Sequence, residues 1–267
     1  MEYDYMIVNI KKKFNKAAKL LIYKIKQKRF RDIIYLLRNE KSNSNTLIIV
    51  FSAFSKIGMP PKYNYCETLQ SVDAMQVYIL DSSGYNKAGS YYLGEDGDWY
   101  IPGQIYELVS NICQKYNKSK IITCGSSKGG TAAAFYGLKL HADAIVIGAP
   151  QYKIGEYLYS DEHMPILRKI IGKVTEENME RVNNLLRNAI REWAHMKNKP
   201  VFHIHYSPEE HTYKEHISEL ISELQLNNYT LELDNAYSYT EHGDVGQYFK
   251  SYLHRVCDNF VESGKQN

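Results

Sequence analysis

Residues 121–134 read IITCGSSKGGTAAA, and this stretch decides how the chain is expected to fold. An apolar run leads into the turn GSSKG at residues 125–129, and an alanine-rich stretch follows it. A buried strand that turns sharply into a helix holds the middle residue of the turn in strained backbone geometry, which only small residues two before and two after it permit. The pattern predicts a strand, a Gly-x-Ser-x-Gly turn and a helix, with Ser127 as a nucleophile.

Two other interpretations of this turn fit the residues less well. Ser126 would have Cys124 and Lys128 at the positions that need small residues. A phosphate-binding loop would need Ser or Thr directly after Lys128 and a further glycine at its start, and both are missing. The helix that begins behind Ser127 also directs backbone N–H groups toward a developing oxyanion.

The rest of the chain alternates between apolar and turn-forming stretches in a strand, helix, strand order. This order predicts a mostly parallel sheet with helices on both faces. Only a short polar turn separates the first two strands, which we therefore expect to form a hairpin. The expected strands are 32–37, 46–52, 76–81, 120–124, 144–147, 200–206 and 229–233.

Apolar residues at helical spacing predict the helices that cover this sheet. About fifty residues separate the strand that ends near Gly148 from the one that starts at Pro200, although a crossover needs only a dozen or so. We expect a small helical cap at about 153–198, with plain core helices as the alternative. The stripes of the covering helices are Ile105, Leu108, Val109, Ile112 and Tyr116; Ile217, Leu220, Ile221 and Leu224; and Val245, Tyr248, Phe249, Tyr252, Leu253 and Val256.

Length and composition favour one large globular domain, which we place at 32–262. No stretch approaches the run of about 18 apolar residues that a membrane-spanning helix needs. The four cysteines are far apart and lack metal-ligand spacing, so we expect reduced core thiols, no metal and no cofactor. The N-terminal lysines follow the only short apolar run, unlike a secretory signal, and the chain is expected to be cytoplasmic.

The first 31 residues are expected to form a basic amphipathic helix, because ten lysines and arginines alternate there with apolar residues at helical spacing. We favour a helix that packs on the domain with its lysines in water. The alternative is attachment to an anionic membrane surface, which would place the protein at the inner face of the membrane. No nucleic-acid partner is expected, and the oligomeric state is left open.

A serine nucleophile needs a base, which in this architecture follows the last strand in the chain order serine, acid, histidine. His242 lies on the polar loop after residues 229–233 and before the last helical stripe. His203 and His205 fall within an expected strand, and His254 falls within the last helix. We therefore predict His242 as the base.

The acid should stand just beyond the strand 200–206, where it orients the imidazole. The loop there offers Glu209 and Glu210 but no aspartate, and we prefer Glu209 because it is four residues past His205. Asp234 is a weaker candidate.

The oxyanion hole should combine two backbone N–H groups. One belongs to Lys128 and the other to Ala53 or Phe54, in the loop after the strand 46–52. The Lys128 side chain is expected to be solvated, and binding of an acidic substrate is the alternative.

With these residues in place, the chain resembles a divergent α/β-hydrolase over about residues 30–262. It also resembles XcbB/CpsF-type capsular polysaccharide biosynthesis proteins and, more remotely, the acyltransferase-like component of accessory Sec systems. The resemblance rests on the turn at 125–129 and on the stretches 47–54, 78–81, 89–94, 148–152 and 154–155. It implies an α/β-hydrolase-like three-layer sandwich and a role in metabolism of bacterial cell-surface glycans, such as O-acylation or deacylation.

Together the residues and the resemblance predict a serine esterase or O-acyltransferase that acts on an acylated glycan or another ester through an acyl-enzyme. Water as the acceptor would make the protein an esterase, and a sugar hydroxyl would make it an acyltransferase. The alternative is a non-catalytic binding module of α/β-hydrolase fold in a membrane-associated glycan assembly.

Overall fold

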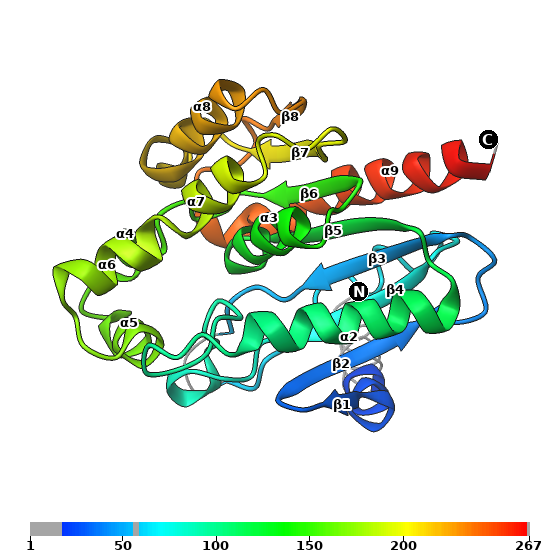
Figure 1. Ribbon diagram of the computed structural model, residues 1–267, viewed down its shortest axis with the longest axis horizontal. Helices are drawn as coiled ribbons and strands as arrows, with labels where there is room; N and C mark the ends of the chain where they lie inside the picture. The colour runs from blue at the N-terminus through cyan, green and yellow to red at the C-terminus, as the bar shows by residue number, and fades with distance from the viewer. Residues whose placement is uncertain (1–17, 56–58, 266–267) are drawn as a thin grey trace, which may run out of the picture.

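The computed structural model describes residues 18–55 and 59–265 (Figure 1). Its centre is one eight-stranded sheet with the strand order β1-β2-β4-β3-β5-β6-β7-β8. Along this order, all neighbouring strands from β4 to β8 pair in parallel. β1 pairs antiparallel with β2, and β2 pairs antiparallel with β4. The expected mostly parallel sheet is confirmed. The strands are β1 (Lys28–Phe30), β2 (Ile33–Arg38), β3 (Thr46–Phe51), β4 (Met75–Leu80), β5 (Lys120–Ser126), β6 (Ala144–Gly148), β7 (Val201–Tyr206) and β8 (Leu231–Asn235).

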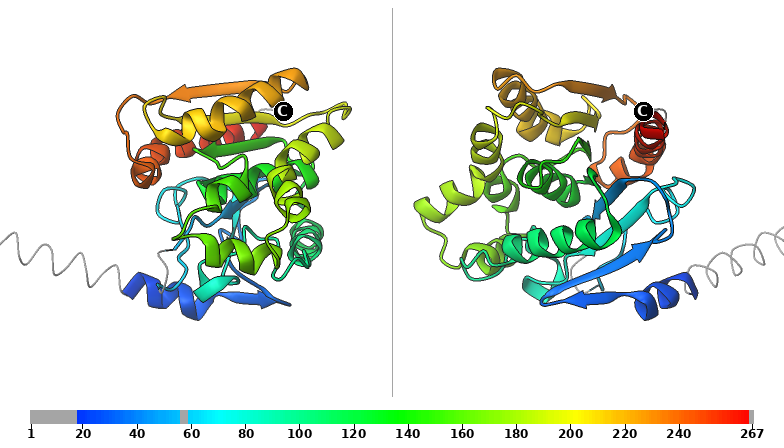
Figure 2. Two further views of the ribbon diagram at one scale, coloured as in Figure 1. Left: turned by 90° about the vertical axis from the view of Figure 1, so that its left-hand side faces the viewer. Right: turned by 45° about the vertical axis from the view of Figure 1, so that its right-hand side comes forward.

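Helices cover the sheet on both faces, and the two faces carry separate hydrophobic cores (Figure 2). Along β3, Leu47, Ile49 and Phe51 belong to one core, whereas Ile48 and Val50 belong to the other. This alternation follows from the two-residue period of a strand. Every residue of β3 and β4 is buried, as expected for strands covered on both sides.

The first core includes residues of α2 (Ile101–Tyr116), α3 (Lys128–Lys139), α7 (Leu185–Glu192) and α8 (Ser218–Leu226). The second core joins α9 (Val245–Lys265) to residues 65–74. The remaining helical segments are η1 (Tyr85–Lys87), α4 (Ile154–Leu158), α5 (Met164–Ile171), α6 (Glu176–Asn183), η2 (Tyr213–Ile217) and η3 (His242–Asp244).

The expected hairpin of the first two strands is wrong. β4 lies between β2 and β3, and it pairs antiparallel with β2 and parallel with β3. The buried strand β3 needs a neighbour on each side, and β4 and β5 supply both. In the sequence, the short polar connection between β2 and β3 looks like a hairpin turn. In the structure it passes the end of β4, which lies between these two strands but comes later in the chain.

The segment between β6 and β7 is helical, and four short helices, α4 to α7, fill the region expected at about 153–198. These four helices differ in whether they cover the sheet or line the pocket. α7 contacts α3 and belongs to the layer over the sheet. Residues of α4 and α5 instead line the pocket described below.

The N-terminal region is helical only in part of the range expected from the sequence. Residues 18–26 are helical, but residues 28–30 form β1, an edge strand paired with β2. Residues 1–17 of the expected helix lie outside the described residues. Within the part of the chain that the structure describes, no helix has the length and apolar character needed to cross a membrane.

Candidate active site

Ser127 stands at the turn between β5 and α3, in a backbone conformation that few residues other than glycine adopt, with φ 53° and ψ −129°. A β-carbon on Gly125 would lie 2.4 Å from the carbonyl oxygen of Gly129. One on Gly129 would lie 2.4 Å from the carbonyl oxygen of Phe51. Both glycines are therefore sterically required, and the turn presents Ser127 at the carboxyl edge of the sheet.

The neighbouring Ser126 is the last residue of β5 and has a different partner. Its hydroxyl lies 2.5 Å from the hydroxyl of Tyr65, and both residues are buried. Desolvation in this setting raises the pKa of Tyr65 and keeps the phenol neutral. Ser126 thus helps to tie the segment around Tyr65 to the end of the sheet.

The structure places His242 beside Ser127, with 2.7 Å between His242 Nε2 and Ser127 Oγ. His242 opens η3, the single turn between β8 and α9. A proton on Nδ1 leaves Nε2 free to accept a hydrogen bond from the serine hydroxyl. This is the arrangement that a general base for Ser127 requires.

Of the two glutamates after β7, Glu210 is the one next to His242. Its Oε1 lies 3.1 Å from His242 Nδ1, and its side chain is completely buried. Burial opposes the charged form of Glu210, but hydrogen bonds from His242 and Thr212 outweigh it and hold its pKa below the ordinary value. The carboxylate can therefore orient the imidazole and stabilise its charged form.

The sequence-based preference for Glu209 is wrong as judged by this geometry. Glu209 is exposed, and only its backbone N–H takes part in the turn, where it donates to Ser207 Oγ. The weaker candidate Asp234 is also placed elsewhere, because its Oδ2 lies 2.6 Å from Nδ1 of His205. In the tight turn after β7, the side chains of Glu209 and Glu210 point in opposite directions. A rule based only on the number of residues after His205 cannot predict which of them faces His242.

Gln151 is a further residue at the site, and the prediction of site residues missed it. Its Nε2 lies 2.9 Å from Ser127 Oγ and 3.1 Å from His242 Nε2. Hydrogen bonds with Thr131 and Tyr91 fix the buried side chain and backbone of Gln151. Its place just after β6, at the carboxyl edge of a parallel sheet, is the signal that could have found it.

The structure leaves fewer candidate N–H donors for the oxyanion hole than the sequence did. The backbone N–H of Ala53 donates to Asn64 Oδ1 at 2.9 Å and is thereby occupied. Within residues 18–55 and 59–265, the N–H groups of Lys128 and Phe54 have no acceptor. These two groups, from the start of α3 and the loop after β3, are the pair left for a developing oxyanion.

The Lys128 side chain is neither solvated nor open to substrate, contrary to both expectations. It is fully buried, and its ammonium lies 2.7 Å from Asp81 Oδ2 and above the rings of Phe54 and Tyr92. Desolvation lowers the pKa of Lys128, while the adjacent Asp81 opposes that shift. The ion pair joins α3 to the end of β4 and to the loop that carries the Phe54 N–H.

We expect Asp81→Asn to destabilise the protein by about 3–5 kcal/mol, because it leaves the Lys128 charge buried without a counterion. The measurement is urea unfolding. Lys128→Met in the Asp81→Asn background should recover much of this loss by removing that charge. Asp73→Asn, at an exposed pair with Lys265, is the matched control and should cost less than about 1 kcal/mol. Equal losses for the two aspartates would contradict the prediction.

A pocket of about 370 Å³ opens onto Ser127 and His242. The loop after β3, residues 64–65, helices α4 and α5 and the loop around η3 line it. Aromatic rings form part of its wall, with Phe54 and Tyr157 both stacked on His163. The pocket can hold an acyl group and a polar acceptor next to the serine.

Fold and geometry together define the class of protein. The chain has an α/β-hydrolase fold with serine, histidine and glutamate in hydrogen-bond contact at the carboxyl edge of the sheet. No known protein family and no curated protein sequence matches the chain. Solved structures do match, and they resemble the chain in fold.

Among these is the capsule O-acetyltransferase of Neisseria meningitidis serogroup A, at 20% identity and a TM-score of 0.70, over 86% of this chain and 93% of that one. A histidine-to-alanine variant of the same protein, in complex with CoA, gives a TM-score of 0.69 at 20% identity, over 86% of this chain and 94% of that one. The Glycosylation Associate Protein complex of Streptococcus agalactiae matches at 19% identity and 0.69, over 88% of this chain and 46% of that one.

Proposed function

We propose that this chain is a serine acyltransferase that works through an acyl-enzyme and delivers the acyl group to a hydroxyl of a bacterial cell-surface glycan. Esterase activity is the same reaction with water as acceptor. The observation that carries the proposal is the hydrogen-bonded series from Glu210 through His242 to Ser127, at 3.1 and 2.7 Å. The similarity in fold to a capsule O-acetyltransferase supports a glycan as acceptor and an acyl thioester of CoA as donor.

In the first half-reaction, Ser127 Oγ attacks the carbonyl carbon of the acyl donor and gives its proton to His242 Nε2. The oxyanion accepts hydrogen bonds from the N–H groups of Lys128 and Phe54. Collapse of this intermediate breaks the bond between the carbonyl carbon and the donor sulfur or oxygen. His242 then returns the proton to the departing thiol or alcohol, and Ser127 carries the acyl ester.

In the second half-reaction, His242 Nε2 takes a proton from the acceptor hydroxyl, whose oxygen attacks the acyl ester. Ser127 Oγ leaves with that proton, and the acyl group stays on the acceptor. The Gln151 amide nitrogen is within hydrogen-bond distance of both Ser127 Oγ and His242 Nε2. The acceptor oxygen has to approach these same two atoms. We propose that this amide positions the acceptor hydroxyl.

The test is to mix the full chain with acetyl-CoA, with and without an oligosaccharide acceptor, and to measure the masses of the intact protein and of its proteolytic peptides. We expect the mass of one acetyl group to appear on the peptide that contains Ser127 and to pass to the sugar when acceptor is added. If folded protein takes no acyl group from acetyl-CoA or from an activated acetyl ester, the proposal fails and the binding-module alternative replaces it.

Replacing Gln151 by alanine is expected to slow transfer to a sugar hydroxyl by about threefold to tenfold, since a neutral hydrogen bond is worth roughly 0.5–1.5 kcal/mol. Hydrolysis should decline less, so the ratio of transfer to hydrolysis should fall. Product analysis with a mixed water and sugar acceptor measures this ratio, which a purely structural role would leave unchanged. Gln104→Ala, at an exposed site bonded to Asp32, is the control. An unchanged ratio in Gln151→Ala contradicts the positioning role.

We also propose that the helix at residues 18–26 attaches the protein to an anionic membrane surface, at the inner face of the membrane. Leu21 and Ile25 lie one helical turn apart and are 59% and 74% exposed. Exposed leucine and isoleucine beside lysines favour the interface of an anionic bilayer.

In co-sedimentation with vesicles that contain phosphatidylglycerol, Leu21→Glu and Ile25→Glu together should reduce binding by tenfold or more, at about 1.5–3 kcal/mol per buried side chain. Leu226→Glu, at another exposed leucine, is the control. Equal binding of wild type and the double variant would exclude this attachment.

A further inference from the structure

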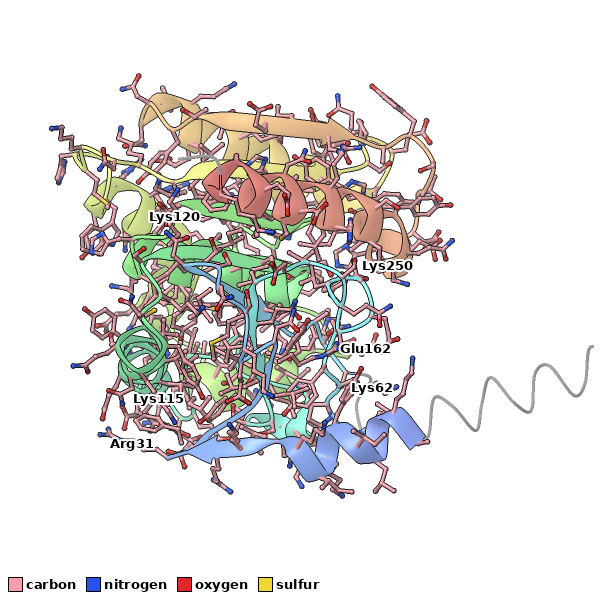
Figure 3. The ribbon with its side chains drawn as sticks, turned by 90° about the vertical axis from the view of Figure 1, so that its right-hand side faces the viewer. Arg31, Lys62, Lys115, Lys120, Glu162 and Lys250 are labelled. Carbon is pink, nitrogen blue, oxygen red and sulfur yellow. The ribbon has the colours of Figure 1, made fainter. Side chains whose placement is uncertain are left out.

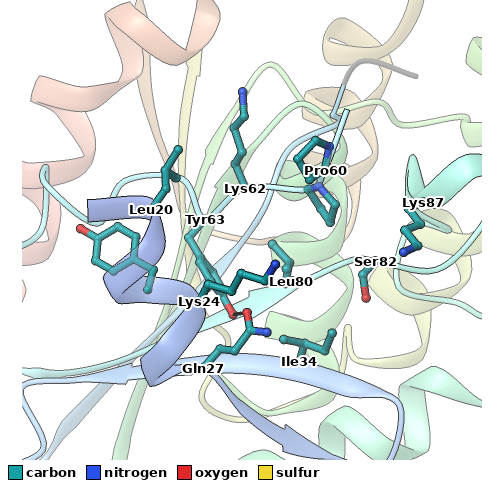
Figure 4. Close-up of a pocket in the computed structure, with 12 residues that line it drawn as sticks. Leu20, Lys24, Gln27, Ile34, Pro60, Lys62, Tyr63, Leu80, Ser82 and Lys87 are labelled. Atoms are coloured by element: carbon teal, nitrogen blue, oxygen red, sulfur yellow. Dashed lines mark hydrogen bonds between the residues drawn. The ribbon is translucent and has the colours of Figure 1, made fainter. Parts of the chain in front are cut away.

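A second pocket, of about 360 Å³, is lined by residues other than those at Ser127 (Figure 4). Its walls come from the helix at residues 18–26, from the paired residues Ile34 of β2 and Leu80 of β4, and from residues 60–63. Leu20, Tyr23, Lys24 and Gln27 contribute from the helix, at the spacing of one helical face. The surface of this pocket is mostly apolar.

Three lysines stand around this apolar surface, and no acidic residue lines the pocket within the described part of the chain. Figure 4 shows Lys24 reaching across the pocket from the helix, with Lys87 on the opposite side and Lys62 above. Among residues 18–55 and 59–265, none of these three lysines has a salt-bridge partner. By contrast, Lys19 and Lys28 nearby pair with Glu67 and Glu40. Among the described residues, the pocket therefore combines apolar walls with positive charge that no acidic side chain pairs with.

The pocket lies at the same edge of the sheet as Ser127. Leu80 ends β4, and Ser127 follows β5, with β3 between these two strands. Two strand spacings of about 4.8 Å put the ends of β4 and β5 roughly 10 Å apart along this edge. Tyr63 lines this pocket and its neighbour Asn64 lines the pocket at Ser127, so one segment forms a wall of both.

Side chains of the two pockets also reach the surface on the same side of the molecule. Figure 3 shows Lys62, which lines the second pocket, and Glu162, which lines the pocket at Ser127, at one edge of the view.

We propose that the second pocket binds the phosphorylated adenosine of a CoA thioester, whose acyl end reaches Ser127. The inference rests on the proposed function and names the donor subsite for it. Three lysines without a salt-bridge partner in the described part of the chain favour phosphates. An adenine ring suits the apolar wall with Tyr63 and the prolines at residues 60 and 61. The flexible pantetheine arm of CoA is long enough to span the roughly 10 Å between the ends of β4 and β5.

The experiment measures binding of CoA and of adenosine 3′,5′-bisphosphate to the full chain by isothermal titration calorimetry. Lys24→Ala, Lys62→Ala and Lys87→Ala are combined in one variant. We expect its Kd for both ligands to rise by about tenfold to 100-fold, from three ion pairs of up to about 1 kcal/mol each. A triple variant at Lys26, Lys41 and Lys197, none of which lines the pocket, changes the net charge equally and should bind CoA as wild type does.

A second measurement separates this subsite from the chemistry at Ser127. The pocket variant should show a raised KM for acetyl-CoA but an unchanged rate with an N-acetylcysteamine thioester, which has no nucleotide. If both triple variants lose the same affinity for CoA, or wild type binds neither nucleotide ligand, the inference is overturned. Lysine-dependent binding of phosphatidylglycerol vesicles in place of the nucleotides would overturn it in favour of a lipid headgroup.

The proposed function fails in a different way. If CoA binds through the three lysines but Ser127 takes no acyl group from any thioester or ester, the pocket is established and the acyltransferase is not. If Ser127 takes acyl groups from simple esters and CoA does not bind, the reverse holds.

Discussion

Replacing Ser127 by alanine is expected to abolish labelling by a fluorophosphonate probe and to lower kcat for acyl transfer by about 10⁴-fold to 10⁶-fold. In the proposed mechanism Ser127 Oγ forms the acyl-enzyme, and His242 Nε2 lies 2.7 Å from this atom. A residual rate should remain, because the N–H groups of Lys128 and Phe54 can still bind an oxyanion. Gel fluorescence after probe treatment and initial rates measure the two effects.

Ser126→Ala is the matched control for this prediction. Ser126 is adjacent in the chain, but its hydroxyl is engaged with Tyr65. Labelling should survive in Ser126→Ala, with a modest loss of stability from the unpaired phenol. Labelling of Ser127→Ala at the wild-type level would contradict the assignment of Ser127 as the nucleophile. Loss of labelling in Ser126→Ala with a normal fold would indicate Ser126 instead.

Glu210→Gln is expected to lower kcat by about 10³-fold to 10⁴-fold while leaving the fold intact. The amide keeps the size of the side chain but no longer carries the charge that stabilises protonated His242. It can also turn its NH₂ group toward Nδ1, which favours the tautomer that cannot accept the serine proton. Steady-state rates with an activated ester measure the loss, and urea unfolding checks the fold.

The same substitution at Glu209 decides between the two glutamates. Glu209 is exposed and lies one residue earlier in the same turn, so Glu209→Gln should change kcat by less than about threefold. A large loss in Glu209→Gln together with a small one in Glu210→Gln would reverse the assignment drawn from the geometry.

Patterns confined to a few neighbouring residues predicted much of this molecule. The Gly-x-Ser-x-Gly spacing identified the turn. The steric role of Gly125 involves the carbonyl oxygen of Gly129, four residues away, whereas Gly129 is constrained by the carbonyl oxygen of Phe51 on the adjacent strand. The strands β3 to β7 were expected within two residues of their observed ends, since apolar runs bounded by turn residues mark buried strands. His242 followed from chain order, which the fold class constrains.

Other features depend on residues far apart in the chain. The position of β4 between β2 and β3 is an example. Strand order depends on which strands are buried and therefore must pair along both edges. The ion pair of Lys128 with Asp81 is another, since 47 residues separate the two and no local pattern connects them. Gln151 likewise reaches Ser127 only because β6 lies beside β5.

The sequence by itself determined the kind of turn, the serine that it presents and the loop that carries His242, because steric and periodic rules act over short distances. Only the tertiary structure decided which glutamate faces the base and which N–H groups stay free for an oxyanion. It also brought three lysines from separate segments around one pocket. Those features depend on the direction of each side chain in a packed structure, which is fixed when distant segments exclude water together.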